Sequence, residues 1–287
     1  MVEKEFSLRE ISDQYLSELE GGLLSPISER VRRDIDLDLF IRGGYINIYF
    51  KGNSLLKLTE KRGGGYAVDI HRKYLQGLKL RQISDRDDVD RFLEMIPFLK
   101  ENILHHGKPS LEIEYEQLII RANNTEKRNN TDYFFIDRQY TLGDNYRIDL
   151  MGIHWPTPRR KGNTVFPCLL EIKFALNTDI RKVDRQLMDY YQLIARNPGK
   201  IARDLKSSLI QRLELGLFDQ QQNRLDALKT LEISPELEDY RFILAFVDYN
   251  PRSTLLDLSA IKALPFADQV KVLYGGFGMW ESNLKAC

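Results

Sequence analysis

The sequence has few of the features that mark specialised classes of protein. Only two of its 287 residues are cysteine, Cys168 and Cys287, which is too few for a disulfide framework or a cysteine-based zinc site. No run approaches the roughly 18 apolar residues of a membrane span. The first residues also lack the apolar core of a signal peptide. We therefore expect a cytoplasmic protein that does not enter a membrane.

An excess of charge of either sign is lacking as well. The 42 Lys and Arg residues balance 42 Asp and Glu residues, so no net positive field attracts a polyanion at long range. Contact with nucleic acid would have to come from a local group of basic side chains. Hydrophobic residues make up 43% of the chain, enough for a packed core, and the length suits one large or two modest domains.

Residues 1–105 are expected to form a small N-terminal domain of helices and an antiparallel sheet, with no role that the sequence reveals. Helical spacing of apolar residues covers 1–37, interrupted by a pair of glycines. Between 39 and 75, short strand-like runs alternate with turns, the pattern of an antiparallel sheet. Ser84 is expected to cap a following helix that has acidic residues in its first turns.

Residues 106–287 are expected to form a second domain, in the order helix, strand, strand, strand, helix, strand. After Ser110 the apolar spacing predicts a helix, and 133–141 with 146–153 predicts a β-hairpin. The apolar run within 166–174 predicts a central strand that is buried on both faces. The fold class is therefore α/β, of the α+β kind. Further helices and strands are predicted at 183–196, 200–217, 240–249, 270–274 and 278–280.

Two charged residues interrupt the predicted central strand. Alternation places Glu171 and Lys173 on one face, where their burial is costly unless something such as a bound cation compensates it. Asp149, 22 positions earlier on the predicted hairpin, would bring a second carboxylate. Mg²⁺ or Mn²⁺ prefers such oxygen ligands and needs only one or two carboxylates plus a substrate phosphate. Lys173 could then hold or deprotonate a water for in-line attack on phosphorus.

Together with Gln186 and Tyr190 on the next helix, these residues resemble the motif of the PD-(D/E)XK nuclease superfamily. The spacing Gln-x-x-x-Tyr is similar to its RecB-type branch, and the stretch Arg-Ile-Asp-Leu around Asp149 is similar to NucS-type DNA endonucleases. The resemblance covers about residues 110–250 and leaves the N-terminal part unexplained. No proline precedes Asp149, which departs from a common feature of the superfamily.

The resemblance implies a restriction-endonuclease-like core, in which a central mixed sheet is flanked by helices. Asp149 and Glu171 would bind Mg²⁺ or Mn²⁺, with the backbone carbonyl of Ile172 as a third ligand, and Lys173 would activate water. The implied function is metal-dependent hydrolysis of phosphodiester bonds, with DNA as the substrate.

The resemblance also assigns roles to side chains on the helices. Glu116, one of three glutamates at alternate positions, is chosen as the helix glutamate of the family because Glu-x-Leu-Ile before an Asn-rich loop is its usual setting. Gln186 and Tyr190 would position a water or a DNA phosphate. Two basic groups flank the central strand, and we expect both to contact nucleic-acid phosphates. They are Arg159, Arg160, Lys161, Arg181, Lys182 and Arg185.

Other interpretations stay open. A lone Glu-x-Lys often marks a solvated strand face, and Tyr190 could be a core aromatic residue, as we expect for Tyr191. The main alternative function is a catalytically inactive nuclease-fold module that binds nucleic acid or a protein partner. The retained acidic residues and Lys173 argue against it, because such a module has no use for a buried Glu and Lys. In a third interpretation the chain is an interaction protein, in which the N-terminal sheet contacts a partner and the second domain is a scaffold. The N-terminal domain could in that case bind a protein partner or form a homodimer.

Overall fold

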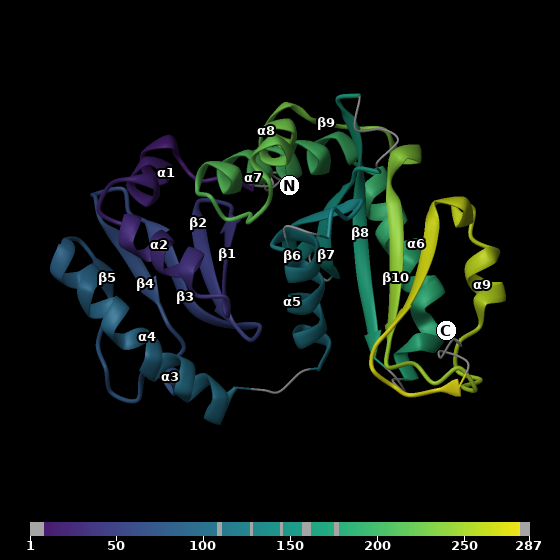
Figure 1. Ribbon diagram of the computed structural model, residues 1–287, viewed down its shortest axis with the longest axis horizontal. Helices are drawn as coiled ribbons and strands as arrows, with labels where there is room; N and C mark the ends of the chain where they lie inside the picture. The colour runs from purple at the N-terminus through teal and green to yellow at the C-terminus, as the bar shows by residue number, and fades with distance from the viewer. Residues whose placement is uncertain are drawn as a thin grey trace, which may run out of the picture. The chain divides into compact units, whose positions relative to one another are not determined.

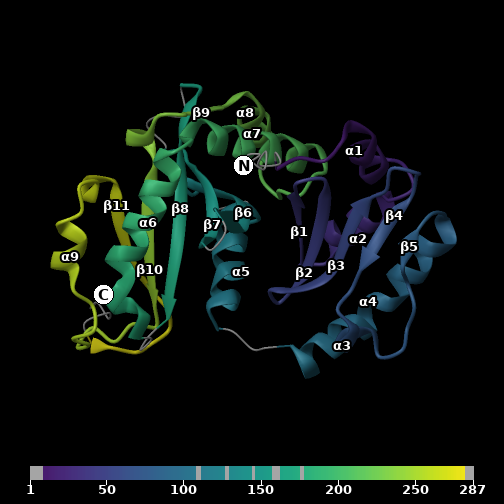
Figure 2. The same cartoon turned by 180° about the vertical axis from the view of Figure 1, so that it is seen from behind.

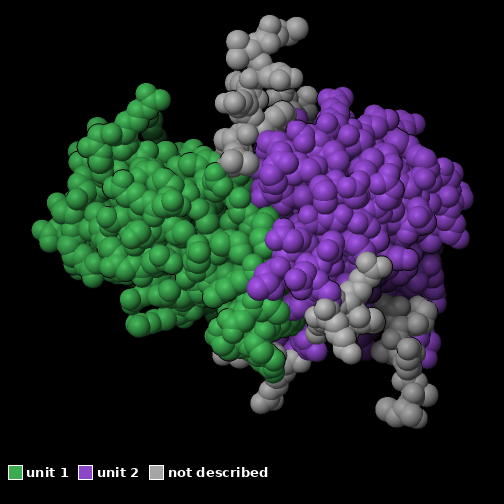
Figure 3. Space-filling view, turned by 90° about the horizontal axis from the view of Figure 1, so that it is seen from above, with its two compact units in different colours: residues 1–113, 206–229 green, residues 114–205, 230–287 purple. Residues whose placement is uncertain are grey.

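Two compact units make up the chain, as the computed structural model shows (Figures 1 and 3). Unit 1 comprises Met1–Ile113 and Lys206–Lys229, and unit 2 comprises Glu114–Leu205 and Thr230–Cys287. None of the described helices has the length and apolar character needed to cross a bilayer. The residues that the structure describes are 9–107, 111–126, 129–143, 146–156, 162–174 and 178–281.

The two units are not the continuous ranges 1–105 and 106–287 that the sequence predicts, because the segment 206–229 joins unit 1. Gln211 shows the physical reason. Its Oε1 accepts a hydrogen bond from Ile11 N at 3.0 Å, and its Nε2 donates to Ile11 O at 2.8 Å. These bonds join segments 200 residues apart, a connection that no local sequence pattern reveals.

Unit 1 contains an antiparallel sheet in the order β1-β2-β3-β4-β5. Burial alternates along β2, as it does in antiparallel sheets with one face on the core and the other toward solvent. The antiparallel sheet predicted for this part of the chain is therefore present. Its strands are β1 (Leu37–Arg42), β2 (Tyr45–Phe50), β3 (Asn53–Glu60), β4 (Tyr66–Asp69) and β5 (Gln82–Ile83).

Helices pack on this sheet and complete the core of unit 1. The longest helix is capped by Asp85, whose side chain accepts a hydrogen bond from Asp88 N at 3.0 Å; the cap predicted at Ser84 is wrong by one residue. The predicted strand region ends in a short helix at Leu75, because His71 caps a helical turn there. The helices are α1 (Asp13–Glu20), α2 (Ser25–Arg33), α3 (Arg72–Leu75) and α4 (Arg86–His106).

Unit 2 contains a mixed sheet in the order β11-β10-β8-β7-β6, with the short strand β9 paired to β8. Strands β6, β7 and β8 pair antiparallel, whereas β8, β10 and β11 run parallel. The predicted order of helix, three strands, helix and strand is thus found within an α/β unit. The strands are β6 (Tyr133–Leu142), β7 (Tyr146–His154), β8 (Thr164–Phe174), β9 (Glu232–Ile233), β10 (Arg241–Val247) and β11 (Val270–Gly275).

The central strands β8 and β10 are buried almost throughout, as expected for parallel strands covered on both faces. Helix α6 (Val183–Ala195) lies over β8 and β10 (Figure 2). Helix α5 (Leu111–Asn124) lies beside β6 in both views (Figures 1 and 2). The side chain of Asn124 fastens it there, donating to Phe135 O at 2.6 Å and accepting from Phe135 N at 2.9 Å.

One predicted strand of unit 2 is absent, and three short elements had no prediction. Residues 278–280 form no strand, because Asp248 Oδ1 accepts hydrogen bonds from Phe277 N at 2.6 Å and Gly278 N at 3.2 Å. These two amides therefore cannot donate hydrogen bonds to a neighbouring strand. The elements without a prediction are β9 and α9 (Leu258–Lys262) in unit 2, and α8 (Gln222–Thr230), of which all but Thr230 belongs to unit 1. The long helix predicted at 200–217 is observed as α7 (Pro198–Glu214).

Candidate functional site

The site begins where strands β7 and β8 separate. Their regular pairing ends at Leu150 and Leu170. Beyond that pair, the side chain of Asp149 replaces the backbone of β7: its Oδ2 accepts a hydrogen bond from Ile172 N at 2.8 Å. The carboxylate of Asp149 is therefore held against β8, directly beside the segment that carries Glu171.

Glu171 is the centre of a network of donors. Its Oε1 accepts hydrogen bonds from Lys173 Nζ and Gln186 Nε2, each at 2.7 Å. Its Oε2 lies 3.0 Å from the hydroxyl of Tyr190, which donates to it. Both Glu171 and Lys173 are buried, so this ion pair lies inside the unit and not on a solvated strand face.

Gln186 and Tyr190 reach Glu171 from helix α6. They are four residues apart, so they share one face of the helix, and Gln186 Nε2 also donates to the Tyr190 hydroxyl at 2.7 Å. Tyr190 is only 1% exposed. The adjacent Tyr191 stacks on Phe266 with ring centroids 4.1 Å apart, which is the core packing expected for it.

Glu116 on α5 joins the site through Gln139. Glu116 Oε2 accepts from Arg138 Nη2 at 2.7 Å, and Oε1 accepts from Gln139 Nε2 at 2.7 Å. The same nitrogen of Gln139 lies 3.2 Å from Asp149 Oδ1. Glu116 is also the only buried member of its group of three glutamates. Glu116, Asp149 and Glu171 are thus connected by side-chain and backbone donors.

Burial and mutual repulsion dominate the electrostatics of these carboxylates. Burial raises the pKa of Asp149 well above its ordinary value, and the nearby charges of Glu171 and Glu116 raise it further. Burial also raises the pKa of Glu116, even though the Arg138 guanidinium opposes this shift. Full ionisation of Glu116, Asp149 and Glu171 is therefore unfavourable in this site, and added positive charge would relieve that penalty.

The chemistry of the donors fits a hard divalent cation. Within the described ranges, no group of three or more His, Cys, Asp or Glu side chains is arranged to hold a metal ion. Mg²⁺ does not require such a group, because one or two carboxylates suffice when substrate phosphate and water supply the rest. Asp149 and Glu171 provide two carboxylates, and each carboxylate oxygen can accept more than one contact.

The basic residues predicted to contact phosphate fall into two groups with different outcomes. Arg159, Arg160 and Lys161 lie outside the described residues. Arg181 and Lys182 end a short 3₁₀ helix (Thr178–Lys182) that follows β8, and Arg185 lies in the first turn of α6. All three of these side chains are exposed.

Sequence reasoning missed Arg138 and Gln139, which connect the carboxylates. A signal for them exists in β6, where Asp137, Arg138 and Gln139 interrupt an otherwise apolar run, as Glu171 and Lys173 do in β8. Gln139 also has a left-handed backbone, with φ of 49°, on the strand whose pairing with β7 shifts between Phe135 and Asp137. This conformation, which the sequence does not predict, turns its amide toward both carboxylates.

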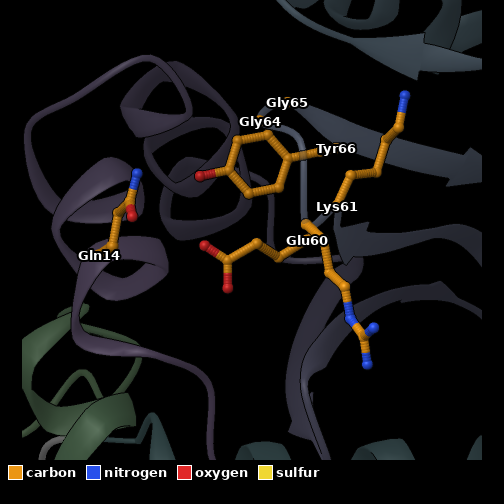
Figure 4. A pocket seen from close by; sticks show the side chains of 7 residues that line it. Gln14, Glu60, Lys61, Gly64, Gly65 and Tyr66 are labelled. Carbon is orange, nitrogen blue, oxygen red and sulfur yellow. The ribbon is translucent and has the colours of Figure 1, made fainter.

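A separate polar hollow of about 290 Å³ lies in unit 1 beside the turn that contains Gly64 and Gly65 (Figure 4). The charged side chains around it already have neighbours. Glu60 Oε2 accepts from Ser12 Oγ at 2.8 Å, and Lys61 Nζ donates to Gln82 Oε1 at 3.1 Å. Because Glu60 and Lys61 are already engaged in contacts with residues distant in the sequence, the hollow is a weaker candidate for chemistry than the carboxylate site.

Comparisons with models of protein families, with curated proteins and with solved structures found no match. The function must therefore be argued from the chemistry of unit 2 itself.

Proposed function

We propose that unit 2 is the restriction-endonuclease-like core of a metal-dependent nuclease that hydrolyses phosphodiester bonds in DNA. The observation that carries the proposal is the hydrogen bond from Ile172 N to Asp149 Oδ2. It brings a second carboxylate to the strand segment that holds the buried pair of Glu171 and Lys173. Two carboxylates and an amine on one strand end are the groups that metal-assisted phosphodiester hydrolysis needs.

Each side chain then has a defined role. Asp149 and Glu171, with the carbonyl oxygen of Ile172, would hold Mg²⁺ or Mn²⁺, which when bound supplies positive charge for the phosphate and lowers the pKa of a bound water. Lys173 would orient the attacking water. It would receive the water's proton once its ammonium group, paired with Glu171, has passed a proton to solvent. Its Nζ is kept in place by the bond of 2.7 Å to Glu171 Oε1.

The remaining residues of the network position these groups. Gln186 and Tyr190 hold Glu171 from helix α6. Glu116 and Gln139 hold Asp149 from the other side of the site. Orientation of this kind is effective because catalytic groups lose little entropy on reaching the reactive geometry. The exposed basic side chains that follow β8, together with Arg159, Arg160 and Lys161, would contact phosphates on either side of the cleaved bond.

One observation favours a second candidate, a nuclease-fold module that binds nucleic acid or a protein without cutting. Both carboxylate oxygens of Glu171 already accept hydrogen bonds from protein donors. A buried polar network that is satisfied in this way can serve stability alone. Metal binding distinguishes the two candidates, because only the nuclease requires it.

Calorimetry with Mg²⁺ and a plasmid-cutting assay on matched variants test the proposal. Glu171→Ala should abolish both metal binding and cleavage. Lys173→Ala should keep metal binding and lower the cleavage rate by about 10²-fold or more, the range for loss of a general base. Lys271→Ala, a change of an exposed lysine on β11, should alter neither. Equal loss of metal affinity in the Glu171 and Lys173 variants would give Lys173 a structural role, and no metal binding by the unaltered protein would favour the non-cutting module.

A further inference from the structure

A row of side chains extends from the proposed catalytic lysine to the edge of the sheet. Lys173 on β8 pairs in register with Phe246 on β10, which pairs in register with Tyr274 on β11. Residues paired across neighbouring strands project from the same face. Since neighbouring strands are about 4.8 Å apart, Tyr274 lies on the face of Lys173, about 10 Å away across the sheet.

The aromatic members of this row support each other. The rings of Phe246 and Tyr274 stack at 5.9 Å between centroids with planes 28° apart. Tyr249 packs against both, at 5.9 Å from Phe246 and 5.6 Å from Tyr274. Phe246 is fully buried, whereas Tyr274 is 52% exposed. The exposed ring is therefore held in a fixed position by a buried one.

We propose that Tyr274 stacks on an unpaired base of single-stranded DNA whose backbone passes Lys173. The inference rests on the proposed function and narrows its substrate to DNA with a single-stranded segment. Aromatic side chains bind single strands by stacking on exposed base faces, whereas duplex bases are already stacked on each other. Stacking also suits a chain with as many acidic as basic residues, because it needs no excess of positive charge.

The same strand provides a matched control. Leu273 precedes Tyr274 on β11 and is 48% exposed, but it belongs to the row of Ala245 and Ile172 and so projects from the opposite face. Replacing Leu273 removes a similar exposed apolar side chain from the same edge strand. It should leave the proposed stacking position unchanged.

The test measures fluorescence anisotropy of a labelled single-stranded oligodeoxynucleotide of about 16 nucleotides, the upper range of such sites, with Ca²⁺ in place of Mg²⁺ to limit cleavage. Tyr274→Ala should weaken binding by about 5- to 150-fold, the value of one stacked base. Tyr274→Phe and Leu273→Ala should each stay within about threefold of the unaltered protein. Binding to duplex DNA should not respond to any of the three.

A probe with an abasic position scanned along its length makes the test specific. The unaltered protein should lose affinity at one position, whereas Tyr274→Ala should be insensitive to that position, since two partners of one contact are coupled. Unchanged affinity of Tyr274→Ala for the single strand, while the unaltered protein still cuts DNA, would overturn the stacking role and leave the nuclease proposal standing. If the unaltered protein neither binds nor cuts DNA, the stacking role and the nuclease proposal are both overturned.

A second copy of the chain is the competing occupant of this edge. Sedimentation of the unaltered protein and of Tyr274→Ala identifies it. A dimer that becomes a monomer on this substitution, with DNA binding unchanged, would assign the ring to self-association and overturn the proposal. A monomer in both cases, combined with the loss of single-strand affinity, supports it.

Discussion

The two units differ in the charged side chains that they bury. Among the described residues of unit 1, no carboxylate is buried, and the buried charged side chains are the guanidinium groups of Arg42, Arg212 and Arg224. Unit 2 instead buries several carboxylates, among them Glu116 and Glu171, together with their cationic partners. A bound cation would therefore find a more suitable environment among the carboxylates of unit 2 than in unit 1.

Unit 1 accommodates two of these guanidinium groups on aromatic rings. Arg212 lies over Phe40 at 4.4 Å and over Phe218 at 4.9 Å from the ring centroids, and Arg42 lies 5.5 Å from Phe40. Burial lowers the pKa of both guanidinium groups. Rings can accept a cation in this way, so aromatic contacts contribute to the burial of positive charge in unit 1.

The carboxylates of unit 2 depend on one another, and this dependence can be broken at Arg138. Arg138→Met should destabilise the protein by about 3–5 kcal/mol at neutral pH, because it leaves the buried charge of Glu116 without its partner. The loss should shrink in acid as Glu116 takes up a proton. Chemical denaturation at several pH values measures this.

Arg212→Met in unit 1 is the matched control for that change. It removes a buried guanidinium that lies on aromatic rings. We expect a loss of only about 1–2 kcal/mol with little dependence on pH, since in the described part of unit 1 the change leaves no buried carboxylate behind. Equal, pH-independent losses of stability in the two variants would mean that the carboxylate of Glu116, left behind when Arg138 is removed, has no energetic consequence.

A smaller effect, of opposite direction, is expected at Asp149. Its raised pKa means that its ionised form is disfavoured in the folded protein. At a pH above this raised pKa, ionisation of Asp149 lowers the stability of the fold. This penalty is relieved as the pH falls through the raised pKa. Asp149→Asn should therefore increase the free energy of unfolding at pH 7 to 8, with the gain disappearing in acid. Mg²⁺ binding should be lost in the same variant. A loss of stability at pH 8 would contradict the repulsion inferred among the carboxylates.

The smallest expected effect is at Asp34 in unit 1. Burial tends to raise its pKa, but bonds from Lys100 Nζ at 2.6 Å and Arg30 Nη2 at 2.9 Å outweigh burial and lower the pKa. Its stabilisation is present above the ordinary carboxyl pKa and is lost as pH falls through the lowered value. Asp34→Asn should cost about 0.5–1 kcal/mol at pH 7, the reverse of Asp149→Asn. The difference between the two urea denaturation curves at pH 7 and pH 3 tests this; a stability gain in the Asp34 variant would refute it.

Much of unit 2 could be predicted because its strands carry strong local patterns. The apolar run of β8 and the charges at Glu171 and Lys173 are visible in the sequence, and so is the spacing of Gln186 and Tyr190 on α6. Each of these signals depends on neighbours along the chain, which is why it survives without knowledge of the tertiary structure.

The features that the sequence did not reveal depend instead on contacts between residues or strands that folding brings together. The bond of Gln211 to Ile11 and the contact of Asp149 with Ile172 join parts of the chain that only folding brings together. The left-handed backbone of Gln139 depends on an irregular strand pairing. Residues 278–280 form no strand because Asp248 takes up the preceding amides. Local propensity contains no information on any of these contacts.

The bond between Ile172 N and Asp149 has a practical consequence for spectroscopy. The amide hydrogen of Ile172 is donated to the carboxylate that carries the raised pKa, so its NMR chemical shift should follow the protonation of that side chain. Its exchange with deuterium should slow when a cation immobilises the carboxylate. A single backbone resonance near the end of β8 would then report whether the centre is protonated, ionised or occupied, with no substrate present.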